Sequence, residues 1–416
     1  MRLLGAPLLT HRATTAHVGA AYPWMAEAGL GSRGVYVGRD LHGGAFCYDP
    51  WELYPRVLTG PNLIVIGELG RGKSALIKSY VFREIVFGRR ALMLDPKGEN
   101  ARLCEALGVQ PVRLQPGGPV RLNPLDPRIA GSEADPDLLR QEQLAALVAI
   151  VGASLGRRLL PQEETALELA LRQASRGREE PTLREVVEAL LRPEAADAHQ
   201  VASSASQVAE DGRQVALALR RLCDGQLRGM FDGPTSEGID LGAPLVSLDL
   251  SAVYHSEALD ILMICAAAWL QRTLARDDHH RRIVVIDEAW VVLKDLQIAR
   301  WMQSSFKLSR ALGVQNVAVV HRVSDLLAAG TAGSEQVELA RGLLRDAATQ
   351  VIYQQPAAEL DQLRQVLHLS EAEVREVLSL PRGVALWRVG DRRFLVMHLL
   401  SPVERWIVDT DQRMTA

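Results

Sequence analysis

The chain has 416 residues, of which 48% are hydrophobic, and its formal net charge is −3. This length allows one large domain or two to three smaller ones, and the apolar content is sufficient for a sizeable buried core. The nearly balanced charge excludes a strong overall attraction to nucleic acid or to an anionic membrane, so any contact with DNA would need a local patch.

Cysteines and apolar segments exclude further classes. The sequence has four scattered cysteines without CxxC spacing, namely Cys47, Cys104, Cys223 and Cys265. This pattern predicts neither a disulfide framework nor a zinc site, and it fits a reducing cytosol. No signal peptide is recognisable, and the longest apolar stretch, residues 261–270, is too short to span a bilayer. We therefore expect a cytoplasmic protein without a transmembrane segment, able to lie peripherally at the inner face of the cell membrane.

The first patterned segment is residues 35–48, in which apolar and polar residues alternate around glycines. Such alternation predicts a β-hairpin. We assign residues 1–55 to an N-terminal segment that carries this hairpin.

A glycine-rich turn follows. Residues 63–66 predict a short strand, residues 75–87 predict a helix, and the turn between them ends in Gly-Lys-Ser. This is the context of a P-loop, in which glycines free backbone N–H groups to cradle a β-phosphate and the new helix adds its positive end. The residues of this motif expected to bind a nucleotide are Gly67, Glu68, Leu69, Gly70, Arg71, Gly72, Lys73, Ser74 and Ala75.

Lys73 and Ser74 carry the chemistry of this motif. Lys73 can reach the β- and γ-phosphates, and the Ser74 hydroxyl can bind Mg²⁺. Only five of the 47 basic residues are lysines. Because lysine and arginine are not interchangeable at a phosphate, a lysine here, in a chain that otherwise uses arginine, favours a functional interpretation.

The strand predicted at residues 91–95 ends in Asp95, and a further strand is predicted at 111–114. Asp95 either places charge near the nucleotide or is an ordinary residue at a strand exit, and the sequence leaves both interpretations open.

From about residue 135 to residue 230, alanine, leucine, glutamate and arginine replace β-branched runs. The periodicity predicts helices over residues 138–155, 162–173, 183–191 and 206–222. We assign residues 131–239 to an all-helical insertion within an α/β domain.

The α/β pattern then resumes. Strands are predicted at residues 244–250, 283–288, 314–320, 350–353, 384–389 and 394–400, the last two as a closing hairpin, and helices at 257–274, 296–312, 336–347, 358–367 and 371–380. This alternation predicts an α/β fold with a mainly parallel sheet covered on both faces, and small β-hairpins at its edges. We assign residues 56–130 and 240–416 to this core.

The strand predicted at residues 283–288 ends in Asp287 and Glu288. Asp287 would bind nucleotide-associated Mg²⁺ through water, and Glu288 would act as general base on the attacking water. Adjacent buried carboxylates are costly unless metal or positive charge compensates them. Their occurrence downstream of a P-loop therefore favours a catalytic interpretation.

Two further catalytic candidates have structural alternatives. His321 follows the apolar strand 314–320 and could sense the γ-phosphate or hold the attacking water, or it could be a loop histidine bonded to the backbone. Arg310 lies at the end of a predicted helix. It could act as an arginine finger in a neighbouring subunit's site, or simply stabilise the helix dipole.

Taken in order, the motifs resemble the conjugative-transfer ATPases of type IV secretion systems, within the FtsK–HerA superfamily, which include TraG- and TraC-like ATP-binding proteins. The resemblance rests on the P-loop, the DPKGE run at 95–99, the RLNPLD run at 121–126, the helical insertion, the VVIDEAW run at 284–290 and the later strand. It covers roughly residues 35–400.

This resemblance implies a RecA-like core, a hexameric ring with ATP and Mg²⁺ at its subunit interfaces, and work on DNA or protein transfer with membrane-bound secretion components. It places Lys73 in Walker A, Asp287 and Glu288 in Walker B, and Arg310 on the finger helix. The superfamily usually carries glutamine where this chain has His321. We expect no counterpart of the large N-terminal domain of the secretion ATPases, because only about sixty residues precede the P-loop.

Three hypotheses follow for the function. The first is an ATP-hydrolysing motor of the conjugation or secretion type. The second is a DNA translocase closer to FtsK or HerA, although no aromatic-interleaved basic stripe supports it. The third is a nucleotide-locked assembly scaffold without turnover, against which the intact Glu288 argues.

Overall fold

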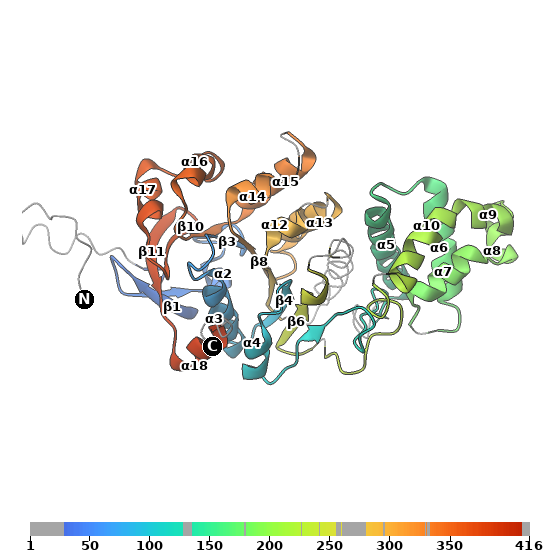
Figure 1. The fold of residues 1–416 in the computed structure, drawn as a ribbon, viewed down its shortest axis with the longest axis horizontal. Coiled ribbons are helices and arrows are strands. Elements are labelled where there is room, and N and C mark those ends of the chain that lie inside the picture. Colours follow the sequence, from blue (N-terminus) through green and yellow to red (C-terminus); the bar gives the residue numbers. More distant parts are fainter. Residues whose placement is uncertain are drawn as a thin grey trace, which may run out of the picture.

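The computed structural model describes residues 29–127, 135–178, 180–225, 227–240, 242–254, 259, 280–293, 296–328, 330 and 333–409. An eleven-stranded sheet forms the centre of an α/β core. The helices between residues 136 and 224 form a separate group that projects from one side of this core (Figure 1).

The sheet is mixed. Its spatial order is β2 (Ala45–Tyr48), β1 (Val35–Asp40), β11 (Arg392–His398), β10 (Val384–Val389), β9 (Thr349–Ile352), β3 (Leu63–Ile66), β8 (Val314–Val320), β7 (Arg282–Ile286), β4 (Arg90–Asp95), β6 (Leu245–Asp249) and β5 (Val112–Arg113). All neighbours from β9 to β5 are parallel, which confirms the mainly parallel sheet. The two predicted hairpins join through β1 and β11, so they form one antiparallel extension at a single edge.

Both faces of the sheet are covered. In β3, Leu63 and Val65 belong to the core on one face, and Ile64 and Ile66 belong to the core on the other. This explains the uninterrupted apolar run, because successive side chains of a strand point to opposite faces. The first face packs against α3 (Lys73–Val86), α4 (Ala101–Ala106) and α18 (Pro402–Val408). The second packs against α12 (Ala289–Val292), α13 (Leu296–Leu308), α14 (Val323–Leu327), α15 (Glu335–Asp346) and α16 (Leu360–Leu367).

The helical group lies in the chain between β5 and β6. It comprises α5 (Pro136–Leu155), α6 (Pro161–Ala174), α7 (Leu183–Leu191), α8 (Ala195–Gln200), α9 (Ala205–Asp211) and α10 (Arg213–Asp224). The helix predicted at 206–222 is divided at Gly212, where a Cβ would lie 2.9 Å from Leu190 Cδ2, so the glycine permits close packing on α7. The helix predicted at 257–274 lies outside the described residues. The division of the chain into three parts stays a prediction.

The RLNPLD run anchors this helical group. Asn123 is fully buried, its backbone N–H donates to Thr235 Oγ1 at 3.0 Å, and its Nδ2 donates to the Pro181 carbonyl at 2.8 Å. Gln143 on α5 donates to the Leu125 carbonyl at 2.7 Å. The motif is therefore a structural link between the sheet and the insertion.

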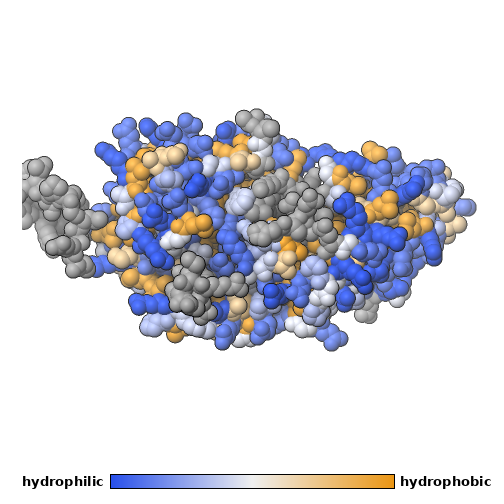
Figure 2. All heavy atoms as spheres, viewed as in Figure 1, coloured by the Kyte–Doolittle hydropathy of each residue, from blue (hydrophilic) through white to orange (hydrophobic). Residues whose placement is uncertain are grey.

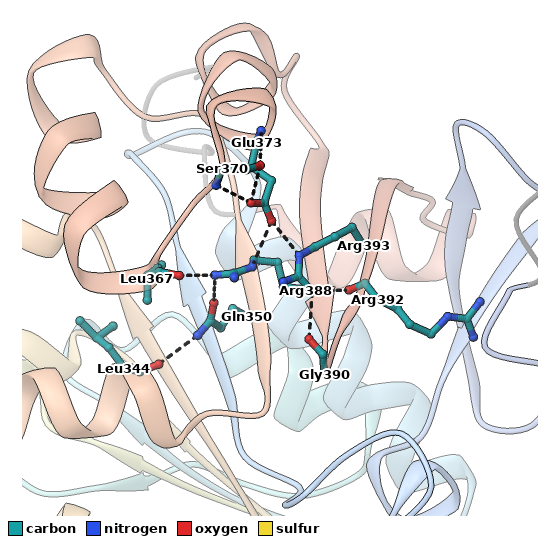
Figure 3. A network of polar contacts seen from close by, with 9 residues as sticks. All are labelled: Leu344, Gln350, Leu367, Ser370, Glu373, Arg388, Gly390, Arg392 and Arg393. Atoms are coloured by element: carbon teal, nitrogen blue, oxygen red, sulfur yellow. Dashed lines mark hydrogen bonds and ion pairs between the residues drawn. The ribbon is translucent and has the colours of Figure 1, made fainter.

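A second polar network fixes α16 and α17 (Glu371–Ser379) to the sheet (Figure 3). Arg388 on β10 donates to Gln350 Oε1 on β9 and to the Leu367 carbonyl, each at 2.7 Å. Glu373 pairs with Arg388 at 3.2 Å and accepts from Arg393 at 2.7 Å. These contacts join the parallel and antiparallel parts of the sheet.

Apolar residues are scattered among polar ones over the face shown in Figure 2. Within the described part of the chain, none of the helices combines the length and apolarity that crossing a membrane would require.

Candidate active site

The glycine-rich turn lies between β3 and α3, and α3 begins at Lys73, two residues earlier than predicted. Gly70 and Gly72 have φ angles of +74° and +111°, which side chains rarely tolerate. A Cβ at Gly67 would lie 2.6 Å from Tyr353 Cβ. Each of these three glycines is thus required by the geometry of the turn.

The neighbouring strands hold this turn in place. Tyr353, just after β9, donates its N–H to the Ile66 carbonyl at 2.8 Å, and the Gly383 N–H donates to the Arg71 carbonyl at 3.1 Å. Tyr353 is buried beneath the turn. The sequence alone did not single out this tyrosine, because its partner glycine lies far away in the chain.

The first turn of α3 is open to a ligand. Gly72 is the N-cap and has no side chain with which to satisfy the first N–H groups, and Ser74 is exposed. Such a helix terminus suits an anion, because its free N–H groups and its dipole both favour negative charge. The turn therefore fits the phosphates of a nucleotide.

Lys73 is buried within the turn. Its Nζ donates to the carbonyls of Gly67 at 2.5 Å and Glu68 at 2.8 Å, and it lies 3.0 Å from His321 Nδ1. Burial lowers the pKa of Lys73 to about 8. Its charge is thus the least hydrated in the turn, which strengthens its attraction for a phosphate.

Glu288 is linked to Lys73 through His321. His321 Nε2 lies 2.8 Å from Glu288 Oε1, Trp290 Nε1 donates to Oε2 at 2.5 Å, and Lys97 forms an ion pair with Oε1. Glu288 is 2% exposed, and its φ of +54° is uncommon for a residue with a side chain. Such backbone strain is typical of functional sites.

The two carboxylates have opposite pKa shifts. Burial alone would raise the pKa of Glu288, but the hydrogen bonds from His321, Lys97 and Trp290 together lower it to about 2. Burial, reinforced by the adjacent Glu288, raises the pKa of Asp287 to about 6. Negative charge at Asp287 is therefore unfavourable unless a cation compensates it.

Asp287 and Ser74 fit a Mg²⁺ ion that is bound mainly by phosphate and water, because such an ion needs only one or two protein groups. In the part of the chain that the structure describes, no cluster of three or more metal-ligating side chains suggests a site that would bind a metal by itself. The donor set thus agrees with a nucleotide-associated ion.

The remaining predicted residues divide between the turn and the far end of the sheet. Glu68 pairs with Arg71 at 3.7 Å and with Arg322 at 3.5 Å. A cavity of about 340 Å³ beside them is lined by Glu68, Leu69, His321, Arg322 and Asp325.

Arg310 is exposed in the turn between α13 and β8. It precedes β8, whereas His321 follows it, and a seven-residue strand spans roughly 23 Å.

Asp95 has a structural role at its strand exit, and two further residues contact Glu288. Asp95 accepts hydrogen bonds from the backbone N–H groups of Lys97 and Asn100, at 3.2 and 2.8 Å, so it stabilises a strand exit. Lys97 and Trp290, which contact Glu288, were not predicted as site residues. Lys97 could have been singled out by the rarity of lysine in this chain.

Residues 56–226 match the family model of an AAA-like domain. None of the curated proteins matches the chain. Among solved structures, VirB4 of Thermoanaerobacter pseudethanolicus is similar with a TM-score of 0.70 and 22% identity, covering 91% of this chain and 100% of that one. The bacterial conjugative coupling protein TrwB is similar with a TM-score of 0.54 and 17% identity, covering 84% and 88%.

The fold is that of VirB4 and TrwB. It is a RecA-like P-loop ATPase fold, so the resemblance to the conjugative-transfer ATPases is confirmed in the architecture. TrwB has also been solved in complex with ADP and Mg²⁺, and that structure is similar to this chain with a TM-score of 0.54 and 16% identity over 82% of this chain and 86% of that one.

Proposed function

We propose that the chain is an ATP-hydrolysing motor of the type IV secretion or conjugative-transfer kind. The observation that carries this proposal is the hydrogen-bonded connection from Lys73 through His321 to Glu288. It joins the phosphate-binding turn to a carboxylate in the position of a general base. The binding of ADP and Mg²⁺ by TrwB supports the choice of ligand.

In this proposal the N–H groups of residues 67–75 bind the β-phosphate, and Lys73 contacts the β- and γ-phosphate oxygens. Ser74, together with Asp287 through water, would hold Mg²⁺, which would neutralise negative charge on the phosphates as the γ-phosphoryl group passes to water. Glu288 orients the attacking water and accepts its proton. His321 senses the γ-phosphate, because its ring contacts both Lys73, which binds that phosphate, and Glu288.

The proposal includes assembly into a homo-oligomeric, hexameric ring. Arg310 is too far from Lys73 of its own subunit to stabilise the transition state, so its role as an arginine finger requires a neighbouring copy. DNA and membrane-bound components of a secretion or conjugation system are the proposed partners. A cytoplasmic location at the inner face of the membrane would accompany them.

Steady-state phosphate release tests this proposal, measured with and without single- and double-stranded DNA, with Glu288→Gln as the blank. We expect turnover that the substitution removes, while calorimetry still detects ATP binding by the variant. Stimulation by DNA would favour DNA transfer, and indifference to DNA would favour protein export or assembly. Tight ATP binding by the unaltered chain without phosphate release, even with partner proteins added, would contradict a motor.

A further inference from the structure

We propose that Lys97 is a positioning residue for Glu288: its ammonium fixes the direction in which the carboxylate presents itself to the attacking water. The inference rests on the proposed function, and it concerns a residue outside both Walker motifs. The observation that motivates it is the ion pair between Lys97 Nζ and Glu288 Oε1.

The loop that carries Lys97 is rigidly constructed. Asp95 accepts hydrogen bonds from the N–H groups of Lys97 and Asn100, and both donors lie within 3.2 Å. Gly98 has a φ of +70°, and a Cβ there would lie 2.9 Å from Asp249 Oδ1. The backbone on either side of Lys97 therefore has little freedom, and its side chain starts from a fixed point.

Two lysines meet this loop and differ in what they contact. Lys78 on α3 is 3% exposed and donates to the Glu99 carbonyl at 2.8 Å, so it anchors the loop. Lys97 leaves the loop with its side chain 30% exposed and ends on Glu288. The first lysine maintains the fold locally, whereas the second connects the loop to the proposed base.

Within the described part of the chain, the contacts of Glu288 leave one acceptor direction free. A carboxylate can accept about four hydrogen bonds. Among the described residues, three donors contact Glu288: Lys97 and His321 on Oε1, and Trp290 on Oε2. The carboxylate is thereby held at both oxygens, and these contacts leave the remaining acceptor direction on Oε2 for the attacking water. Removal of Lys97 would leave Oε1 with His321 alone and allow the carboxylate to rotate.

This role predicts a separation of turnover from binding. We expect Lys97→Met to lower kcat ten- to a hundredfold, about what misplacement of a reacting group costs. Calorimetry should show the Kd for ATP, measured with Mg²⁺, within about twofold of the unaltered chain, because Lys97 contacts Glu288 rather than the turn. Lys97→Arg should recover part of the loss, since arginine keeps the charge and the donors.

Lys78→Met is the matched control, since it removes the other lysine of the same loop. It should lower the melting temperature, because it leaves the loop unanchored. Unchanged kcat in Lys97→Met would overturn the proposal. A raised kcat would also overturn it, because Lys97 would then slow turnover. A weakened affinity for ATP with kcat intact would overturn it too, because Lys97 would then be a phosphate ligand.

A readout without nucleotide separates this inference from the proposed function. Melting of Lys97→Met, Glu288→Gln and the double variant forms a double-mutant cycle. We expect the double variant to lose less than the sum of the single losses, because each single change leaves a charge without its partner. Strict additivity would refute the pairing even in an active enzyme. Coupling in a chain that binds ATP without turnover would refute the motor but retain the pair.

Discussion

Two buried carboxylates, one near each end of helix α3, have pKa values that are shifted in opposite directions. Near its first turn, Glu288 is 2% exposed and has hydrogen bonds from three side chains, so its pKa falls to about 2. In its last turns, Glu84 is fully buried, and among the described residues neither of its oxygens accepts a hydrogen bond. Burial raises the pKa of Glu84 to about 7. Similar burial therefore has opposite electrostatic results, and the donors make the difference.

The surroundings of Glu84 indicate a packing role. Arg89 Nε lies 3.6 Å from Glu84 Oε2, while Arg89 also pairs with Asp49 at 2.7 Å. The guanidinium groups of Arg89 and Arg281 lie 5.3 and 5.7 Å from the ring centroid of Trp51, on α2 (Pro50–Leu53). This end attaches the N-terminal hairpin to the core. The comparison thus separates the proposed active site from an end of the helix that attaches the hairpin.

The largest expected effect is at the chemical end. Lys73→Ala should abolish phosphate release and weaken ATP binding beyond detection by calorimetry, because it removes the buried cation of the phosphate turn. Lys307→Ala, which removes an exposed lysine on α13, is the control and should leave both quantities unchanged. Full turnover by the Lys73 variant would show that the turn is not the nucleotide site.

A substitution at Arg310 tests whether this residue, just before β8, acts as an arginine finger in a neighbouring subunit. Arg310→Ala should lower kcat on the order of 10³-fold, the effect typical of a lost arginine finger. Mixed with Glu288→Gln, it should regain activity, because about a quarter of the interfaces in a random ring then combine an intact Glu288 with an intact Arg310. If the mixture stays as inactive as its components, Arg310 does not act across subunits.

A smaller effect is expected for the link between Lys73 and Glu288. His321→Ala should lower kcat about tenfold while ATP binding persists, because Glu288 loses one of the hydrogen-bond donors that hold it. His321→Gln keeps a side chain that can donate a hydrogen bond, and it should retain more activity than the alanine variant. Equal activity in the two variants would mean that the ring contributes nothing through its hydrogen bonds.

Most of the sheet could be predicted because its strands are uninterrupted apolar runs. Residues 63–66 and 314–320 were expected as strands, and the structure has the same bounds for β3 and β8. The joining of the two hairpins could not be predicted, because the pairing of Gly38 with His398 is set by tertiary packing rather than by local sequence.

The candidate site also contains residues that the sequence could indicate and residues that it could not. Lys73, Asp287 and Glu288 could be predicted as candidates because each belongs to a local motif with a known spacing. Lys97 and Trp290 could not be assigned to Glu288, because a contact across strands or across a strained turn leaves no periodic signal. His321 was found as a strand end, but its two partners were visible only in the structure.

The smallest expected effect is on stability, at the Glu84 end. The pKa of Glu84 is raised from the usual 4.5 to about 7, so the folded protein binds more protons than the unfolded chain between these pH values. Stability should therefore fall as the pH rises from 4.5 through 7, by about 3 kcal/mol from this group. Glu84→Gln should remove that component, with a gain in melting temperature at pH 8 that vanishes near pH 4.5, and unchanged kcat.

Glu404 on α18 provides the opposite case. It is also buried, but Arg83 donates to its Oε1 at 2.5 Å and the Ser401 N–H to its Oε2 at 2.7 Å. Burial would raise the pKa of Glu404, but these hydrogen bonds together lower it. The stability that Glu404 contributes is therefore present above its unfolded pKa and is lost as the pH falls.

Glu404→Gln should destabilise the protein at pH 8 and less so at acidic pH. If both glutamine variants shifted the melting temperature in the same direction at pH 8, hydrogen-bond donors would not be what distinguishes the two carboxylates.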